Sequence, residues 1–212
     1  KGAVLVKFLK TGQACISPNS IFVHQSIIEP FIEEFKSRVS KMLAGSGFED
    51  GVSIGPLVND AAIQKVDRQV RDAVDQGATL ICGGQRLKDN DLDKGFFYAP
   101  TLLGGVTPNM LIYREETFGP VAPVITFNTD EEVLEMANDT NYGLAAYVYT
   151  RSLSRAMRMF EGLRFGIIGI NDINPTAAAA PFGGMKESGM GREGGRDGIV
   201  EYLETKLVGF SV

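Results

Sequence analysis

The sequence predicts an α/β fold in which helices flank a largely parallel sheet. Segments typical of strands and of helices alternate along the 212 residues, and several predicted strands are continuous apolar runs. Strands of a parallel sheet have this character because helices cover both of its faces. Hydrophobic residues make up 44% of the chain, which is enough for a packed core. The fold class alone does not indicate a function.

The first half of the chain carries the clearest local signals. Residues 20–24 form a short apolar strand that includes the single histidine, His24. Ser26 and Glu29 then have the spacing of a capping box, which predicts the start of a helix. Apolar residues at helical spacing form the core-facing stripe of that helix: Ile27, Phe31, Phe35 and Val39.

The alternation continues to the end of the chain. A second helix is predicted to begin at Asp60 and to end at Gly77, because glycine is typical of the position after a helix. Further strands are expected at residues 78–82, 121–127, 145–149 and 166–170, and further helices at 130–138, 152–161 and 194–204. Residues 206–211 are predicted to be extended, and no linker or repeat suggests a domain boundary.

Composition excludes several classes of protein. The net charge of −5 argues against a nucleic-acid surface, which needs a clustered basic face. No apolar run is long enough to cross a bilayer, and the start does not have the pattern of a signal peptide. The two cysteines, Cys15 and Cys82, lie too far apart for a disulfide framework or a zinc site, so no metal is expected. A reducing compartment is expected, either the cytoplasm or the mitochondrial matrix.

Cys15 is the first candidate for chemistry. It follows Gly12 and precedes a strand, and glycine lets the backbone turn tightly. A cysteine on such a turn can have its thiolate stabilised by nearby N–H groups or by a cation such as Lys10. A free cysteine is more often a buried structural residue, so the local sequence leaves both interpretations open. Cys82 lies inside an apolar strand and is interpreted as structural.

Two other segments have unusual composition. Glu115–Pro120 places two acids and an aromatic before a strand, where a carboxylate can accept hydrogen bonds from sugar hydroxyls. A solvated acidic turn is the alternative for this segment. Gly189, Gly191 and Gly194 form a nominal G-x-G-x-x-G, but that fingerprint must directly follow a strand and open a βαβ unit. We interpret these glycines as shaping a loop close to a pocket.

The order of these segments resembles that of the aldehyde dehydrogenase superfamily. The similarity covers essentially the whole chain, from just before the nucleophile to the C-terminus. It is carried by Phe8–Cys15, Gly55-Pro56-Leu57, Glu115–Pro120, Asn141–Leu144, Asn171 and Pro181–Gly189. The resemblance implies the catalytic domain of the aldehyde dehydrogenase fold, with Cys15 as its nucleophile.

The resemblance also implies a mechanism, that of an NAD(P)-dependent oxidoreductase acting on aldehydes. The thiolate of Cys15 attacks the aldehyde carbonyl and forms a thiohemiacetal, while the backbone N–H of Cys15 helps to hold the oxyanion. Hydride passes to NAD or NADP, and water hydrolyses the resulting thioester. The product is a carboxylic acid.

Further site residues follow from the same resemblance. Glu116 is expected to hold the nicotinamide ribose and Phe118 to lie against the nicotinamide. Lys65, on the helix that begins at Asp60, is expected to reach toward the adenosine ribose. On the substrate side, Phe182 lines the funnel and Asn171 has a supporting role.

The resemblance assigns several parts of such an enzyme to the region before the nucleophile. They are the dinucleotide-binding domain, the general-base glutamate and an asparagine of the oxyanion hole, and only fourteen residues precede Cys15. We therefore expect a catalytic domain at residues 1–205, an oligomerisation strand at 206–212, and no dinucleotide-binding domain in this chain. We expect these residues alone to be inactive as a dehydrogenase. The apolar run Leu207–Phe210 is expected to pair with another copy in a homo-oligomer.

The sequences of these motifs are most similar to those of the succinate-semialdehyde dehydrogenase group, from which this chain differs at three places. That group's arginine six residues before the nucleophile is Leu9 here, its substrate-loop serine is replaced within residues 176–180, and its second cysteine is Ser17. A carboxylate substrate calls for a fork of donors, which Leu9 does not offer. Lys10 is the nearest cation that can substitute, and it lies one position away. A less polar aldehyde is equally compatible.

Two alternatives to a dehydrogenase remain open from the sequence. The chain fits a truncated, non-redox homologue with a binding or structural role. It also fits a cysteine esterase, since Cys15 can be acylated without a cofactor.

Overall fold

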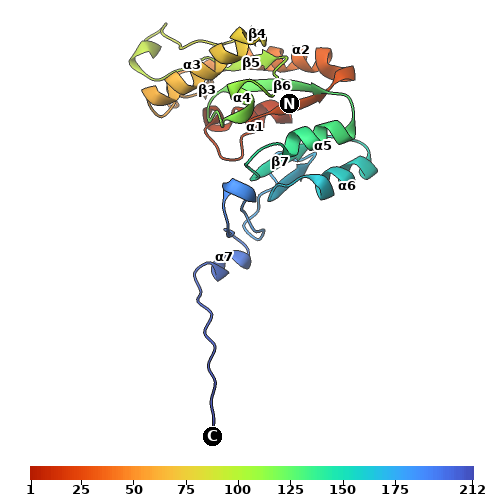
Figure 1. The fold of residues 1–212 in the computed structure, drawn as a ribbon. Helices are drawn as coiled ribbons and strands as arrows, with labels where there is room; N and C mark the ends of the chain where they lie inside the picture. Colours follow the sequence, from red (N-terminus) through yellow and green to blue (C-terminus); the bar gives the residue numbers. More distant parts are fainter. The chain divides into compact units, whose positions relative to one another are not determined.

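The computed structural model describes all 212 residues, which form two compact units, Lys1–Thr140 and Asn141–Val212 (Figure 1). The first unit runs from red to green in Figure 1 and contains most of the helices and strands. No stretch rich in proline, glycine or serine marks the boundary, so composition does not reveal it.

The first unit is built on a four-stranded sheet in the order β1-β6-β5-β4. β1 (Ile21–His24), β6 (Val121–Phe127) and β5 (Thr101–Gly104) are parallel, and β4 (Thr79–Cys82) is antiparallel to β5. This confirms the predicted, largely parallel sheet. The sequence did not predict β5, because it is a four-residue run bounded by Pro100 and by glycine. A separate parallel pair consists of the short strands β2 (Leu43–Ala44) and β3 (Val52–Ile54).

Helices of the first unit contribute to two buried clusters, one for each face of the sheet. The helices are α1 (Gly2–Lys7), α2 (Ile28–Val39), α3 (Asp60–Asp75), α4 (Leu111–Arg114) and α5 (Asp130–Asn138). Adjacent residues of β5 divide between the clusters: Leu103 packs with residues of α3, and Leu102 with residues of α1 and α2. Such alternation is expected of a strand that is covered on both faces.

The helix starts agree with the sequence only in part. α3 begins at Asp60 as predicted, and the Asn59 side chain caps it by accepting a hydrogen bond from Ala62 N–H at 2.9 Å. Gly77, at φ 101°, follows its end as predicted. The predicted capping box at Ser26 is wrong, because a 3-10 turn intervenes and α2 begins at Ile28. There His24 Nδ1 accepts a hydrogen bond from the Ser26 N–H at 3.1 Å.

The second unit contains one strand–helix–strand motif. β7 (Ala145–Val148) and β8 (Ile167–Ile170) are parallel and are connected through α6 (Leu153–Gly162), confirming all three predictions. The predicted helix at 194–204 is reduced to α7 (Asp197–Val200). An extended, exposed tail follows it, drawn in blue in Figure 1.

Four short 3-10 helices complete the secondary structure of the two units. They are η1 (Leu9–Gly12), η2 (Gln25–Ile27), η3 (Leu92–Lys94) and η4 (Lys186–Ser188). None of the helices combines the length and the apolar character that crossing a bilayer requires.

Candidate active site

Cys15 lies on an exposed turn between η1 and β1. The backbone before it is unusual, because Lys10 and Thr11 have left-handed φ values of 49° and 64°. Gly12 follows at φ 75°, and a Cβ atom there would lie 2.1 Å from the carbonyl oxygen of Gly119. Only glycine permits this approach between the two backbones, which explains the Gly12 of the motif.

Side chains on either side of Gly12 fix the turn to residues 55–58. The Thr11 hydroxyl accepts a hydrogen bond from the Gly55 N–H at 2.9 Å and lies 3.3 Å from the Gly55 carbonyl oxygen, to which it donates. The Gln13 amide donates to the Pro56 carbonyl at 3.1 Å and accepts from the Val58 N–H at 3.0 Å. The Gly55-Pro56-Leu57 motif therefore supports the nucleophile turn.

The loop Glu115–Pro120 presents two of its side chains outward. Glu116 and Phe118 are exposed, the latter by 40%, whereas Thr117 and Gly119 are buried. Phe118 has a left-handed φ of 51°, a conformation that costs energy for a bulky residue and needs support from its surroundings. The sequence predicted Glu116 and Phe118 as cofactor contacts, and both are accessible to a ligand.

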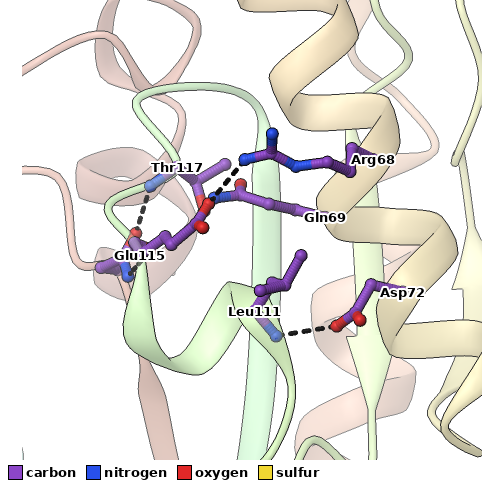
Figure 2. Close-up of polar contacts among 7 residues, drawn as sticks. Arg68, Gln69, Asp72, Leu111, Glu115 and Thr117 are labelled. Carbon is purple, nitrogen blue, oxygen red and sulfur yellow. Dashed lines mark hydrogen bonds and ion pairs between the residues drawn. The ribbon is translucent and has the colours of Figure 1, made fainter.

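Helix α3 anchors this loop (Figure 2). One oxygen of Glu115 accepts hydrogen bonds from Arg68 at 3.0 Å and from the fully buried Gln69 at 3.1 Å. One turn further along α3, the Asp72 carboxylate accepts a hydrogen bond from the Leu111 N–H at 2.7 Å. Glu115 is therefore a structural member of the acidic pair and leaves Glu116 as the exposed one.

Lys7 is a site-related residue that the sequence prediction missed. It is only 1% exposed, and its backbone carbonyl accepts a hydrogen bond from Ser17 Oγ at 2.9 Å. Burial lowers the pKa of the Lys7 ammonium to about 7, while the negative charge of Glu116 opposes that shift. The signal that sequence reasoning overlooked is a lysine inside the apolar run from Ala3 to Phe8.

The other predicted site residues divide between the units. Lys65 is half-buried on α3, and Leu9 is 44% exposed on η1, so both share the unit of Cys15. Phe182 and Asn171 belong to the second unit. The structure therefore brings the nucleophile and the three predicted cofactor contacts into one compact unit.

Within the second unit, Asn171 and Phe182 have defined local partners. Asn171 directly follows β8 at φ 54°, and its amide donates to the Thr150 carbonyl at 2.8 Å and accepts from the Thr150 N–H at 3.0 Å. Phe182 exchanges two backbone hydrogen bonds with Glu193, both at 2.7 Å. The Asn171 amide thus binds the backbone of Thr150, two residues beyond the end of β7.

Cys82 differs from Cys15 in its surroundings. It is half-buried in β4, and burial raises the pKa of its thiol. A raised pKa lowers the fraction of reactive thiolate, which supports its interpretation as a structural residue. No group of histidine, cysteine and acidic residues in the structure has the arrangement of a metal site.

Comparison with known proteins decides the family. Residues 1–208 match the sequence model of the Aldehyde dehydrogenase family. The chain belongs to the aldehyde dehydrogenase family. This confirms the resemblance that the order of the motifs indicated.

Individual aldehyde dehydrogenases match over nearly the whole chain. It is 47% identical to an aspartate-semialdehyde dehydrogenase (non-phosphorylating) of Halomonas elongata over 96% of its length, and 47% identical to the mitochondrial succinate-semialdehyde dehydrogenase of Arabidopsis thaliana over 98%. The structure matches betaine aldehyde dehydrogenase of Staphylococcus aureus in complex with NAD+, at a TM-score of 0.92 and 37% identity over 97% of the chain. The chain spans 41%, 39% and 41% of these three proteins.

Proposed function

We propose that the gene product containing these residues oxidises an aldehyde to a carboxylic acid with NAD or NADP. One observation carries this proposal: the exposed Cys15 turn and the loop that presents Glu116 and Phe118 meet where Gly12 approaches Gly119. A nucleophile and two candidate cofactor contacts thus lie on neighbouring, well-supported loops. Because the chain spans about two fifths of its relatives, the activity is proposed for the complete gene product, and residues 1–212 alone are expected to be inactive.

Cys15 carries the covalent chemistry in this proposal. Its thiolate attacks the carbonyl carbon of the aldehyde, so that a carbon–sulfur bond forms and the carbonyl electron pair moves to oxygen. The backbone N–H of Cys15 stabilises that oxyanion. After oxidation of the thiohemiacetal, water cleaves the thioester, releasing the acid and regenerating the Cys15 thiol.

The residues of the first unit fit a nicotinamide cofactor. The exposed Glu116 carboxylate can accept hydrogen bonds from ribose hydroxyls, and the exposed Phe118 ring offers a flat apolar face for the nicotinamide. Lys65 is half-buried on α3, and in this proposal it would hold the adenosine ribose. When bound, NAD or NADP supplies the hydride acceptor.

Leu9 bears on the choice of aldehyde. The curated relatives include dehydrogenases named for aspartate semialdehyde and succinate semialdehyde, which both carry a carboxylate. Leu9 is an apolar, 44% exposed side chain and provides no hydrogen-bond donor. Both a semialdehyde and an uncharged aldehyde therefore stay candidate substrates. Leu9→Arg should raise the kcat/KM ratio of succinate semialdehyde to butanal, and an unchanged ratio would remove Leu9 from the substrate side.

The proposal also assigns different roles to the main part of the chain and to its C-terminal segment. Residues 1–205 supply the catalytic domain, and residues 206–212 pair with a second copy of the chain. Leu207 and Phe210 support the pairing, because they are 97% and 91% exposed in the single chain. A reducing compartment, either the cytoplasm or the mitochondrial matrix, would keep the Cys15 thiol available.

The test is NAD(P)H formation by the complete gene product with a panel of aldehydes. Cys15→Ala should abolish the activity, and the matched variant Cys82→Ala should keep it within about 2-fold. Full activity of Cys15→Ala would reject the mechanism. Hydrolysis of p-nitrophenyl acetate through Cys15 without any NAD(P)-dependent oxidation would indicate an esterase instead.

A further inference from the structure

Asn19 links the nucleophile segment to the loop that carries Glu116. It lies four residues after Cys15 and is half-buried just before β1. Its side-chain NH2 donates to the Glu115 carbonyl at 2.9 Å and to the Ile112 carbonyl at 3.5 Å. Its side-chain oxygen accepts a hydrogen bond from the Thr117 N–H at 2.8 Å. The two closest contacts are to the backbone groups on either side of Glu116.

The chemistry of these contacts requires an amide. A backbone carbonyl can only accept and a backbone N–H can only donate, so the partner must offer one donor and one acceptor in a fixed arrangement. Asparagine does so, whereas aspartate keeps the acceptor and loses the donor. The amide thus replaces the regular hydrogen-bond partners that the loop around Glu116 lacks.

A second contact joins the same two segments at their other ends. Gly12, three residues before Cys15, lies against the backbone of Gly119, three residues after Glu116. Asn19 then joins the segments again on the far side of Cys15. The nucleophile and Glu116 are therefore each flanked by two fixed points, and neither segment can slide along the other without breaking one of them.

The hydrogen bonds from α3 to the Glu115 side chain have a different role from the contacts of Asn19. Arg68 and Gln69 hold the Glu115 side chain, which fixes the loop to a helix but not to the nucleophile (Figure 2). The Arg68 guanidinium is largely exposed, so its ion pair adds little. Asn19 belongs to the nucleophile segment itself and therefore sets the distance between the two loops.

We propose that Asn19 is a positioning residue that holds the Glu116 loop, and through it the cofactor ribose, at a fixed place relative to the Cys15 thiol. This inference rests on the proposed dehydrogenase function. Reactions that need two bound groups in near-attack geometry lose about 100-fold in rate when one is misplaced by about 1 Å. Acylation of Cys15 by an activated ester needs no cofactor and so does not depend on Glu116.

The experiment compares these two reactions in Asn19 variants of the complete gene product. For Asn19→Ala we expect kcat/KM of the NAD(P)-dependent oxidation to fall by about 10- to 100-fold, mainly through a higher KM for the cofactor. Hydrolysis of p-nitrophenyl acetate should stay within about 2-fold. Asn19→Asp should lie between wild type and Asn19→Ala, because it keeps the acceptor for Thr117 N–H.

Thr129→Ala is the matched control for stability. Thr129 caps α5 by accepting a hydrogen bond from the Glu132 N–H at 3.1 Å, and its carbonyl accepts one from the Val133 N–H, so both bonds are to α5. It should lower the melting temperature comparably and leave the ratio of the two activities unchanged. Asn19→Asp keeps the test valid should Asn19→Ala not fold.

The outcomes are distinguishable. A parallel fall of oxidation and ester hydrolysis in both Asn19 variants, or no fall in either, would overturn the positioning role. Ester hydrolysis by wild-type protein without NAD(P)-dependent oxidation would overturn the proposed function, and with it the inference on Asn19.

Discussion

The nucleophile region and the glycine-rich region at 181–195 keep their shapes by different means. Around Cys15, the side chains of Thr11, Gln13 and Asn19 bind the backbone of neighbouring segments. The glycine-rich region combines backbone hydrogen bonds of the Phe182–Glu193 pair with four glycines at positive φ: Gly189, Gly191, Gly194 and Gly195. Its main side-chain support is Arg192, whose guanidinium donates to the carbonyls of Gly184 and Gly191. Side-chain truncations should therefore be most damaging near Cys15, where the position of each reacting group is set by a particular side chain.

Gly12→Ala should have the largest effect, because the nucleophile region itself depends on one glycine. The added Cβ would lie 2.1 Å from the Gly119 oxygen, and φ 75° is unfavourable for alanine. We expect a loss of about 3 kcal/mol or more in the free energy of unfolding, measured by urea denaturation. The control Gly47→Ala, which meets nothing within 4 Å, should change stability by less than about 0.5 kcal/mol. Equal stability of both variants would show that the Gly12–Gly119 contact is not tight.

Lys7→Met should have the next largest effect on the free energy of unfolding. Lys7 belongs to the nucleophile region, because its carbonyl accepts a hydrogen bond from Ser17. The folded pKa of Lys7, about 7, is below the unfolded value of 10.5, so the unfolded chain binds more protons between these values. Stability should therefore rise with pH through this window, by about 2 kcal/mol from pH 7 to pH 9. The variant should be more stable than wild type at pH 7 and lack this part of the slope. Thermal melts of both proteins at several pH values would measure this dependence. If the melting temperature rose equally with pH in wild type and variant, a buried, titrating Lys7 would be contradicted.

Asn171→Ala tests the unit that contains the glycine-rich region, with a side chain of the same kind as Asn19 that lies outside residues 181–195. Losing both hydrogen bonds to Thr150 should lower the free energy of unfolding by about 1–2 kcal/mol. The rate at which iodoacetamide labels Cys15 should stay within about 2-fold, since the contacts that support Cys15 lie in the first unit. A large change in labelling would mean that Asn171 supports the nucleophile as well.

Thr117→Val should have the smallest effect, and like Lys7→Met at pH 7 it should stabilise the protein. The Thr117 hydroxyl is buried without a hydrogen-bond partner, so replacing it by a methyl should stabilise the protein by about 1 kcal/mol. Thr101→Val is the matched contrast, because the buried Thr101 hydroxyl donates to Ala99 at 2.7 Å and accepts from Gly84 at 2.8 Å. That variant should lose about 2 kcal/mol. Destabilisation by Thr117→Val would show that its hydroxyl has a partner.

Much of the fold follows from the sequence because hydrophobic periodicity reports burial directly. The apolar stripe Ile63, Val66, Val70 and Val74 predicts α3; the first three are buried as expected, whereas Val74 is 39% exposed. The apolar run of residues 121–127 predicts the strand β6. β5 was missed because four residues give too short a pattern, and α2 was placed too early because its 3-10 start depends on the His24 side chain. Short elements and caps depend on contacts with distant residues, which periodicity does not contain.

The candidate site shows the same limit. Cys15, Glu116 and Phe118 were predicted from motifs, and the structure shows all three exposed. Asn19 was missed because its importance arises from hydrogen bonds to Glu115 and Thr117, far along the chain. Lys7 was missed because its importance arises from burial in the folded chain and from the charge of Glu116. Motifs therefore indicate which groups react, whereas the structure is needed to find what holds them.

The most direct test of the central claim is to trap the acyl group on Cys15. The complete gene product would be mixed with an aldehyde substrate and NAD(P)+, quenched in acid within one turnover, and analysed by peptide mass spectrometry. We predict the mass of the corresponding acyl group on the peptide containing Cys15 and none on the peptide containing Cys82. Turnover with an acyl group on another residue, or with Cys15 unmodified under conditions that preserve thioesters, would contradict Cys15 as the nucleophile.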